Sequence, residues 1–169
     1  MKIILSDRPL SLDLGDRTDV VSFDLSHMKI APCVGCFGCW TRTPGKCVIR
    51  DDAVKVYPVL AGSDAALYVS RVRYGGYDLV MKTMLERAIP VQQAFIRLLD
   101  GETHHVQRAV VPKRAVIVAY GARDKAEEEL FRRLVARNAK NMSFQNYEIR
   151  FTDEEQVEAE VRREVETWA

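Results

Sequence analysis

The sequence predicts an α/β protein built around a parallel sheet. Short apolar runs alternate with amphipathic segments along the 169 residues, and this alternation is typical of strands joined by helical crossovers. The run from Ala65 to Ser70 is continuously apolar in character, as expected for a strand buried on both faces. No linker or shift in composition divides the chain, so we expect one domain over residues 1–169.

Five apolar runs account for the expected strands, at residues 2–6, 19–24, 65–70, 114–120 and 146–151. Between the first two runs, residues 7–18 contain Pro9, Gly15 and several aspartates but no helical stripe, which predicts a loop. A βαβ unit usually takes roughly thirty residues or more, and the segment from Lys2 to Asp24 is shorter than that. The first helix is therefore expected to be absent or a single turn.

Apolar residues at helical spacing predict the helices. Besides a short one at Pro90, four are expected: one capped by Asp51 or Asp52, one after Gly76, one over residues 125–140, and a last one that begins with the capping box Thr152-x-x-Glu155.

The region between the third and fourth strands is predicted as a short helix and a connector. Pro90 is expected to begin a helix that turns inward the side chains of Val91, Ala94, Phe95 and Leu98. Residues 101–112 then form a polar connector, in which His104 and His105 are expected to be exposed.

Five strands with helical connections favour a three-layer sandwich with the flavodoxin-like strand order 2-1-3-4-5. In that order the first and fifth helices share one face of the sheet, so loss of the first helix would leave Ile3 and Leu5 uncovered. The apolar stripe of the last helix is too narrow to cover the gap alone. Because an exposed apolar groove usually marks an interface, we expect a homo-oligomer.

Charge and hydropathy exclude some classes of partner. The formal net charge of +1 gives no general attraction to nucleic acid or to anionic membranes. No apolar stretch approaches the length of a membrane span, and the first apolar run is too short for the core of a signal peptide. We therefore expect a cytoplasmic protein, in which clustered cysteines more often bind metal or carry out redox chemistry than form structural disulfides.

All 4 cysteines lie within one short segment, at Cys33, Cys36, Cys39 and Cys47. We call residues 33–47 the cysteine segment. Its C-x2-C-x2-C-x7-C spacing lets the thiols converge, and soft thiolates suit zinc or an iron–sulfur cluster. Three cysteines at intervals of three favour the compact runs that hold [4Fe–4S] clusters over paired zinc ligands. Unligated or disulfide-paired thiols are the alternative.

Ligands of an open parallel sheet lie beyond the carboxyl ends of its strands. Three predicted loops lie there, at residues 6–16, 70–76 and 120–124, and the cysteine segment follows the second strand on the same edge. A redox centre in the cysteine segment would thus face a ligand in the crevice.

The sequence resembles the NADPH-dependent FMN reductase superfamily, and its iron–sulfur flavoprotein branch most closely. The resemblance rests on the segment from Ile30 to Trp40, on Gly45 to Asp52, on the strand near Ala65, and on Met81 to Arg87 in place of a family helix. It covers roughly residues 28–122.

The resemblance implies a flavodoxin-like protein that binds FMN, takes hydride from NAD(P)H or electrons from a protein donor, and transfers electrons. It implies a [4Fe–4S] cluster on the four cysteines. The loops at 70–77 and 120–124 match those on either side of the flavin ring, which gives as candidate cofactor-binding residues Ser70, Arg71, Arg73, Tyr74, Gly75, Gly76, Tyr120, Gly121 and Ala122.

Two departures from the family pattern leave the function open. The stretch from Ser6 to Ser11 has no glycine and no following helix, and Asp7 places a negative charge where backbone N–H groups should cradle a phosphate. Arg71 and Arg73 replace a Pro-x-Tyr pattern in the ring loop. The leading hypothesis is a flavin-dependent oxidoreductase, with no catalytic residue identified. The alternatives are a non-enzymatic subunit that acts by association and a thiol or metal sensor.

Overall fold

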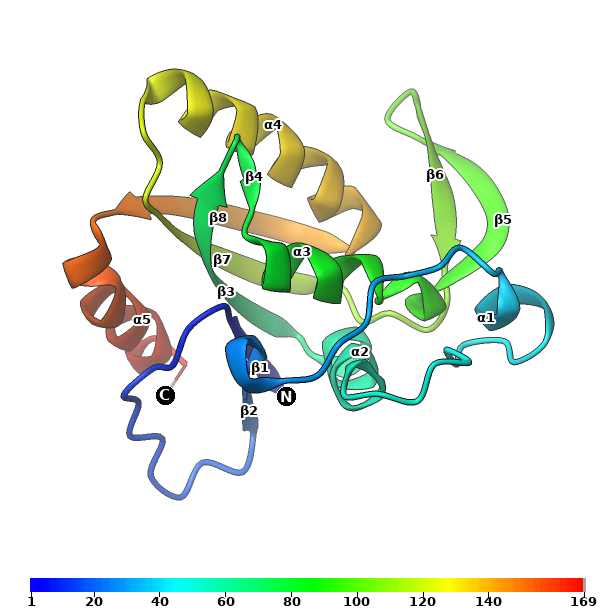
Figure 1. The fold of residues 1–169 in the computed structure, drawn as a ribbon, viewed down its shortest axis with the longest axis horizontal. Coiled ribbons are helices and arrows are strands. Elements are labelled where there is room, and N and C mark those ends of the chain that lie inside the picture. The colour runs from blue at the N-terminus through cyan, green and yellow to red at the C-terminus, as the bar shows by residue number, and fades with distance from the viewer. Residues whose placement is uncertain (169) are drawn as a thin grey trace.

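Parallel strands form the centre of the molecule (Figure 1). In the computed structural model, which describes residues 1–168, they pair in the order β2 (Val20–Asp24), β1 (Lys2–Ser6), β3 (Ala65–Arg73), β7 (Lys113–Tyr120) and β8 (Phe144–Thr152). Every neighbouring pair in this path is parallel. Counted over these strands alone, the order is the predicted 2-1-3-4-5.

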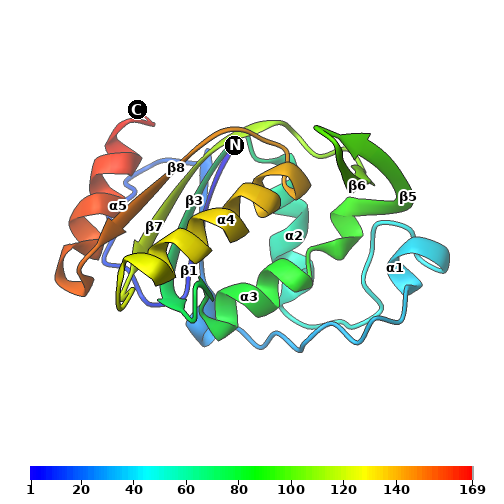
Figure 2. The same cartoon turned by 90° about the horizontal axis from the view of Figure 1, so that it is seen from above.

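Helices cover both faces of the sheet (Figure 2). On one face, α2 (Ala53–Gly62), α3 (Leu79–Glu86) and α4 (Lys125–Asn141) share a single apolar core with alternate strand residues. On the other face, α5 (Val157–Glu166) packs against the remaining strand residues. The strand interiors are buried from both sides, which explains their continuous apolar character.

No helix connects β1 to β2 within the described chain, as predicted, but the sheet is not left open. Ile3 and Leu5 face the side of α2 and α3, and both are fully buried. Ile4 faces the side of α5 and is also fully buried, because leucines from the connecting loop pack over that part of the core, namely Leu10, Leu12 and Leu14. The expectation of an uncovered apolar groove was wrong, and this argument for a homo-oligomer fails with it.

A β-hairpin replaces the helix and connector expected between residues 90 and 112. A 3₁₀ turn, η2 (Ile89–Val91), leads into β5 (Gln92–Leu99) and β6 (Glu102–Gln107), which pair antiparallel. Asp100 and Gly101 both have positive φ in the turn, the geometry of a two-residue hairpin loop. Phe95 and Leu98, expected inward, are 72% and 76% exposed.

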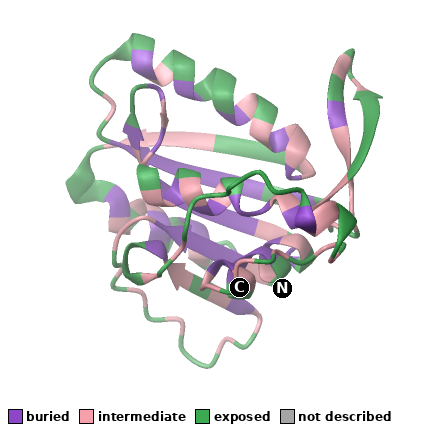
Figure 3. Ribbon diagram, turned by 45° about the vertical axis from the view of Figure 1, so that its right-hand side comes forward, coloured by how far each residue is buried: buried purple, intermediate pink, exposed green. Residues whose placement is uncertain are grey.

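His104 lies in this hairpin and is buried rather than exposed. Its ring nitrogens contact the Asn141 side-chain oxygen at 2.9 Å and the Glu102 carboxylate at 3.0 Å. The contact with Asn141 holds the hairpin against α4. Figure 3 shows much of β5 as exposed, in contrast to the buried sheet.

The loop expected at residues 70–77 is largely strand. β3 continues to Arg73, turns at Tyr74 and Gly75, and pairs antiparallel with β4 (Gly76–Tyr77). We call residues 70–77 the β3–β4 hairpin. Near the C-terminus the capping-box prediction was also wrong, because Thr152 ends β8 and a 3₁₀ turn, η3 (Glu154–Gln156), precedes α5.

Two short elements lie in the first third of the chain. They are η1 (Leu25–His27) and α1 (Gly38–Thr41), which is a single turn inside the cysteine segment. Among the helices of residues 1–168, none combines the length and the apolar character that crossing a membrane would require.

The leucine-bearing loop should contribute measurably to stability. Replacing Leu10, Leu12 and Leu14 together by serine is expected to lower the free energy of unfolding by about 3 kcal/mol, roughly 1 kcal/mol for each half-buried side chain. Urea unfolding followed by circular dichroism measures the change, and Ser11→Ala in the same loop is the matched control. An unchanged unfolding midpoint would show that the loop does not cover the sheet.

Candidate functional site

The four predicted metal ligands lie around one small cavity. Cys33, Cys36, Cys39 and Cys47 all line a cavity of about 50 Å³, which we call the cysteine cavity. The thiols of all four are free, with Cys33 and Cys36 exposed and the other two half-buried. The structure thus brings together the residues that the spacing singled out.

Two backbone features close the cysteine segment around this cavity. Phe37 has a φ of 55°, in the left-handed region, and precedes the single turn of α1. A Cβ on Gly38 would lie 2.8 Å from Val48 Cγ1 and 3.5 Å from Cys36 Sγ. Only glycine therefore lets the start of α1 approach the chain around Val48 this closely.

A buried arginine from the end of α3 holds the segment from beneath. The Arg87 side chain is 1% exposed and forms a bidentate ion pair with Asp51, at 2.6 and 2.9 Å. It donates to the carbonyl oxygens of Ala31 and Ile49, which flank the cysteine segment on either side, and to Cys47 Sγ at 3.4 Å. One guanidinium group thereby fixes both ends of the segment and contacts one of its thiols.

The charge state of the cysteine cavity is determined by four neighbouring thiols and the Arg87 guanidinium. Burial raises the pKa of the Cys39 thiol, and the other three cysteines raise it further. The Cys39 thiol therefore lies within electrostatic reach of the other three sulfur atoms, since like charges disfavour the ionised form. Burial also works to raise the pKa of Asp51, but the hydrogen bonds from Arg87, Ala31 and Ala53 outweigh it and hold that pKa below its usual range.

Two residues in the wall of the cysteine cavity carry buried N–H groups without partners. Trp40 Nε1 and Arg87 Nε are buried and have no hydrogen-bond partner within residues 1–168, and both residues line the cysteine cavity. Iron–sulfur clusters accept hydrogen bonds on their sulfur atoms. Four thiols and free N–H groups are the kinds of donor that hold a cluster. Over the same residues, no group of three or more histidine, cysteine or carboxylate side chains is arranged to hold one metal ion, so the donor chemistry fits a cluster whereas the spacing of the thiols is not that of a single-metal site.

The loop after β1, where relatives would hold a phosphate and where the sequence departs from that pattern, is filled by the protein itself. The Asp7 carboxylate accepts the backbone N–H of Arg71 at 2.6 Å and the Tyr120 hydroxyl at 2.8 Å. The N–H of Asp7 donates to Val69, and the N–H of Arg8 donates to Ser6 Oγ. Burial raises the pKa of Asp7 despite these hydrogen bonds. A half-buried carboxyl group whose neighbouring amides are already engaged does not fit a phosphate.

The nine predicted cofactor-binding residues divide between two cavities and a structural network. Gly121 lines a cavity of about 240 Å³ together with Arg71, Arg73, Tyr74 and Arg123, which we call the arginine cavity. A larger cavity, of about 740 Å³, lies between α3 and α4, and we call it the helix cavity; its wall includes Arg73, Tyr74, Gly75 and Gly76.

The other predicted residues serve the fold. The Ser70 hydroxyl accepts the N–H of Asp78 and donates to the carbonyl oxygen of Arg71, so it stabilises the base of the β3–β4 hairpin. The Tyr120 hydroxyl bonds to Asp7. Ala122 packs against the edge of the main core.

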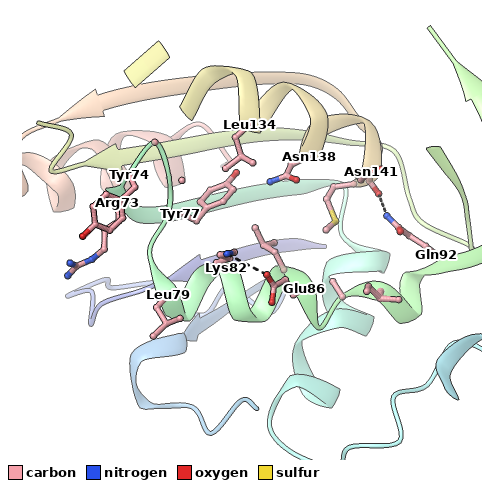
Figure 4. A pocket seen from close by; sticks show the side chains of 16 residues that line it. Arg73, Tyr74, Tyr77, Leu79, Lys82, Glu86, Gln92, Leu134, Asn138 and Asn141 are labelled. Carbon is pink, nitrogen blue, oxygen red and sulfur yellow. Dashed lines mark hydrogen bonds and ion pairs between the residues drawn. The ribbon is translucent and has the colours of Figure 1, made fainter. Parts of the chain in front are cut away.

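The sequence analysis missed most of the helix cavity (Figure 4). Its polar residues include Lys82 and Glu86 from α3 and Asn138 and Asn141 from α4. The two asparagines lie three residues apart and so share one helix face, a signal that could have marked a polar patch beside the apolar stripe of α4. Arg87 was also missed as a site residue, since its partner Asp51 is distant in sequence.

Comparison with known proteins finds relatives by sequence and shared folds by structure. No family model matches the sequence. The chain is 30% identical over 88 residues to an iron–sulfur flavoprotein of Methanosarcina thermophila, which covers 52% of this chain and 44% of the relative. It is 35% identical over 72 residues to an iron–sulfur flavoprotein of Archaeoglobus fulgidus, which covers 43% of this chain and 32% of the relative. The matches therefore span less than half the length of these relatives.

Solved structures share the fold at low sequence identity. The FMN complex of an FMN-dependent NADH-azoreductase from Bacillus anthracis superposes with a TM-score of 0.63 at 8% identity, over 99% of this chain and 96% of that one. An NAD(P)H:quinone oxidoreductase from Methanothermobacter marburgensis gives 0.57 at 10% identity, over 99% and 98%. The fold is flavodoxin-like. The resemblance of the sequence to iron–sulfur flavoproteins is confirmed.

The Arg87–Asp51 ion pair should stabilise the folded protein more than an exposed ion pair does. Arg87→Leu is expected to lower the free energy of unfolding by about 3 kcal/mol, because it leaves a partly buried carboxylate without its partner. The matched control Arg73→Leu removes a 57% exposed partner of Asp78 and should cost less than about 1 kcal/mol. Denaturant unfolding at neutral pH measures both.

The Arg87–Asp51 pair also determines the direction in which stability changes with pH. Because the pKa of Asp51 is lowered in the folded state, its contribution is fully present above the unfolded value of about 4 and is lost as the pH falls through the folded value. The stability difference between wild type and Arg87→Leu should therefore shrink in acid. A difference that stays constant down to the folded pKa would contradict this role of the pair.

Proposed function

We propose that this chain is a flavin-linked redox protein of the iron–sulfur flavoprotein kind, in which the cysteine segment holds a [4Fe–4S] cluster. The observation that carries the proposal is the cysteine cavity: four free thiols line one cavity, and the same cavity is lined by Trp40 and Arg87, each of which has a buried N–H group without a partner. The curated relatives, which are named iron–sulfur flavoproteins, support the same reading.

The residues around the cavity have distinct roles in this proposal. Cys33, Cys36, Cys39 and Cys47 would ligate the cluster. Arg87 would offset part of its negative charge, and Trp40 would donate a hydrogen bond to it while its ring excludes water. The Trp40 ring lies 4.8 Å from that of His105 in β6, so the β5–β6 hairpin would hold this cover in place. A bound cluster supplies one-electron transfer, which the chain's own side chains do not.

In this proposal the β3–β4 hairpin contributes to the flavin site. Four of the nine predicted residues, Arg73 to Gly76, lie in this hairpin and border the helix cavity. The FMN phosphate would not occupy the loop after β1, because Asp7 fills it. As an oxidoreductase the protein would take electrons from NAD(P)H or from a protein donor; no comparison favours the alternative of a non-enzymatic subunit.

Anaerobic purification provides the test of the cluster. We expect a brown protein with a broad visible absorption and about four iron and four sulfide per chain, as a [4Fe–4S] cluster requires. Cys36→Ser should lose most of this iron on desalting, because it removes one ligand. Val34→Ala, which changes an exposed neighbour in the same cavity, should keep it. A colourless wild-type protein that does not take up iron and sulfide on reconstitution would contradict the proposal.

A further inference from the structure

The loop after β1 does not fit a phosphate, so a phosphate-bearing ligand of the proposed redox protein needs a phosphate site elsewhere. Asp7 already accepts the N–H of Arg71 and the Tyr120 hydroxyl there. Ligands of an open parallel sheet lie beyond the carboxyl ends of its strands. The arginine cavity lies at that edge, because most of its residues come from the end of β3 and from the loop after β7.

Three arginines and one glutamate line the arginine cavity. Arg71 and Arg73 lie two residues apart in β3, so their side chains are on the same face of the strand. Arg123 comes from the loop after β7. The carboxylates that pair with Arg71 and Arg73 belong to Glu154 and Asp78, neither of which is among the described residues of the wall. The wall itself thus carries an excess of positive charge, which favours an anion.

Two of these arginines have hydrogen-bonding capacity that the protein leaves unused. Arg73 donates to Asp78 through Nε at 2.9 Å, and Arg123 donates to Glu127 through Nε at 3.4 Å. Within residues 1–168, the terminal Nη groups of Arg73 and Arg123 make no hydrogen bond to another residue. A guanidinium group carries five N–H donors in a planar fork that matches the oxygen atoms of a phosphate. The unused Nη groups are therefore suited to donate to one.

The existing ion pairs offer little resistance to an incoming anion. The Arg73 and Arg123 side chains are 57% and 71% exposed, and exposed ion pairs contribute little to stability. Because each of these two hydrogen bonds uses only Nε, a phosphate can bind at the Nη groups without breaking it.

Glu127 and an aromatic ring hold the two walls of the cavity in place. The Glu127 carboxylate accepts the N–H of Gly75 at 3.3 Å and the N–H of Arg123 at 2.8 Å, so it joins the β3–β4 hairpin to the loop after β7. The Arg123 guanidinium lies over the Tyr74 ring, 5.7 Å from its centre, in a cation–π contact. These contacts position the cation before any ligand binds.

The position of Arg71 depends on a glycine. Gly121 has a φ of 74°, and a Cβ added to it would lie 3.0 Å from Arg71 Nη1 and 3.3 Å from Arg71 Cγ. A larger residue would therefore displace the Arg71 side chain. The Arg71 guanidinium also lies over the Tyr120 ring, 5.0 Å from its centre. The third cation of the wall is thus positioned by its surroundings as well.

The volume of the cavity suits a chemical group and not a whole ligand. It is about 240 Å³, below the roughly 300–1,000 Å³ of sites that enclose a drug-sized molecule. A phosphate group fits such a volume, and the rest of a nucleotide would extend out of the cavity.

We propose that the arginine cavity binds the phosphate monoester of a nucleotide ligand, with the Nη groups of Arg73 and Arg123 as donors and Arg71 adding positive charge. This inference rests on the proposed function, which supplies the nucleotide, and adds a site for its phosphate. Two ligands of a flavin-linked redox protein carry this group: FMN on its ribityl chain, and NADPH on its adenosine ribose. Riboflavin and NADH lack it.

Inorganic phosphate is the probe that tests the site without flavin, cluster or activity. Isothermal titration calorimetry of the purified protein, in a buffer free of phosphate and sulfate, gives its dissociation constant. The double variant Arg73→Gln with Arg123→Gln should weaken phosphate binding at least about tenfold, because it removes two charge-assisted donors. Arg163→Gln is the matched control, since its side chain is 64% exposed and pairs with Glu160 within α5. It should leave the constant unchanged.

Two pairs of ligands then identify the source of the phosphate. If the flavin supplies it, FMN should bind at least about tenfold tighter than riboflavin, and the double variant should remove that difference. If the nicotinamide dinucleotide supplies it, the same should hold for NADPH against NADH. Either result supports the site. A double variant that weakens inorganic phosphate but changes neither comparison would show a site for the free ion only and would overturn the inference.

Other outcomes separate this site from the proposed function. Wild-type protein that binds no phosphate would overturn the inference, and so would equal weakening by the double variant and by Arg163→Gln, which would indicate general charge attraction. Circular dichroism checks that the variants are folded. Protein that binds phosphate at the arginines, and NADPH more tightly than NADH, but neither flavin would keep the site and contradict the flavin part of the proposed function. Flavin binding that the double variant leaves unchanged, with phosphate binding also unchanged, would keep the function and remove the site.

Discussion

The burial of the Arg87 guanidinium is the constraint on which the cysteine segment depends. Removing a charge from water is costly unless a partner and hydrogen bonds surround it, and here the partners come from chain segments far apart in sequence. Asp51, Ala31 and Ile49 supply oxygen atoms from both flanks of the segment. The segment thus closes over a fixed cation, and its thiols converge because their flanks are held. Arg87 in turn is fixed by Met81 and Met84, which anchor α3 in the core.

A second network, of hydrogen bonds and ion pairs at the carboxyl ends of the strands, takes the place of the helix that is missing after β1. Without a helix after β1, the carboxyl ends of β1, β3 and β7 are joined by Asp7, which bonds to Arg71 and Tyr120. Glu154 adds ion pairs to Arg8 and Arg71, and both guanidinium groups lie over the Tyr120 ring. These bonds occupy the crevice where an open parallel sheet usually binds its ligand. The structure that compensates for the lost helix therefore also removes the usual phosphate site.

Sequence patterns predicted the features that are set by residues close together in the chain. They missed the features that are set by contacts between residues far apart in the chain. The parallel strands were predictable because apolar runs buried on both faces have few alternative structures. The β5–β6 hairpin was missed because Val91, Ala94, Phe95 and Leu98 have helical spacing, although Asp100-Gly101 is itself a hairpin signal. Helical spacing predicts a helix on the assumption that the spaced apolar residues are buried, so it could not show that Phe95 and Leu98 are exposed. The cysteine positions were predicted from spacing, but the Arg87–Asp51 pair was not, since no local pattern links the two residues.

These features assign α3 and the turn after it a central position between the two candidate centres. The inner face of α3 lies in the core, its outer residues line the helix cavity, and its C-terminal Glu86 and the following Arg87 line the cysteine cavity. Lys82 and Glu86, one turn apart, form a loose ion pair at 3.8 Å on the face toward the helix cavity. Arg87 directly follows this helix and is held by its bonds to the two flanks of the cysteine segment. The end of α3 and the turn after it therefore form the wall that the two cavities share, and the same buried arginine positions both that wall and the cysteine segment.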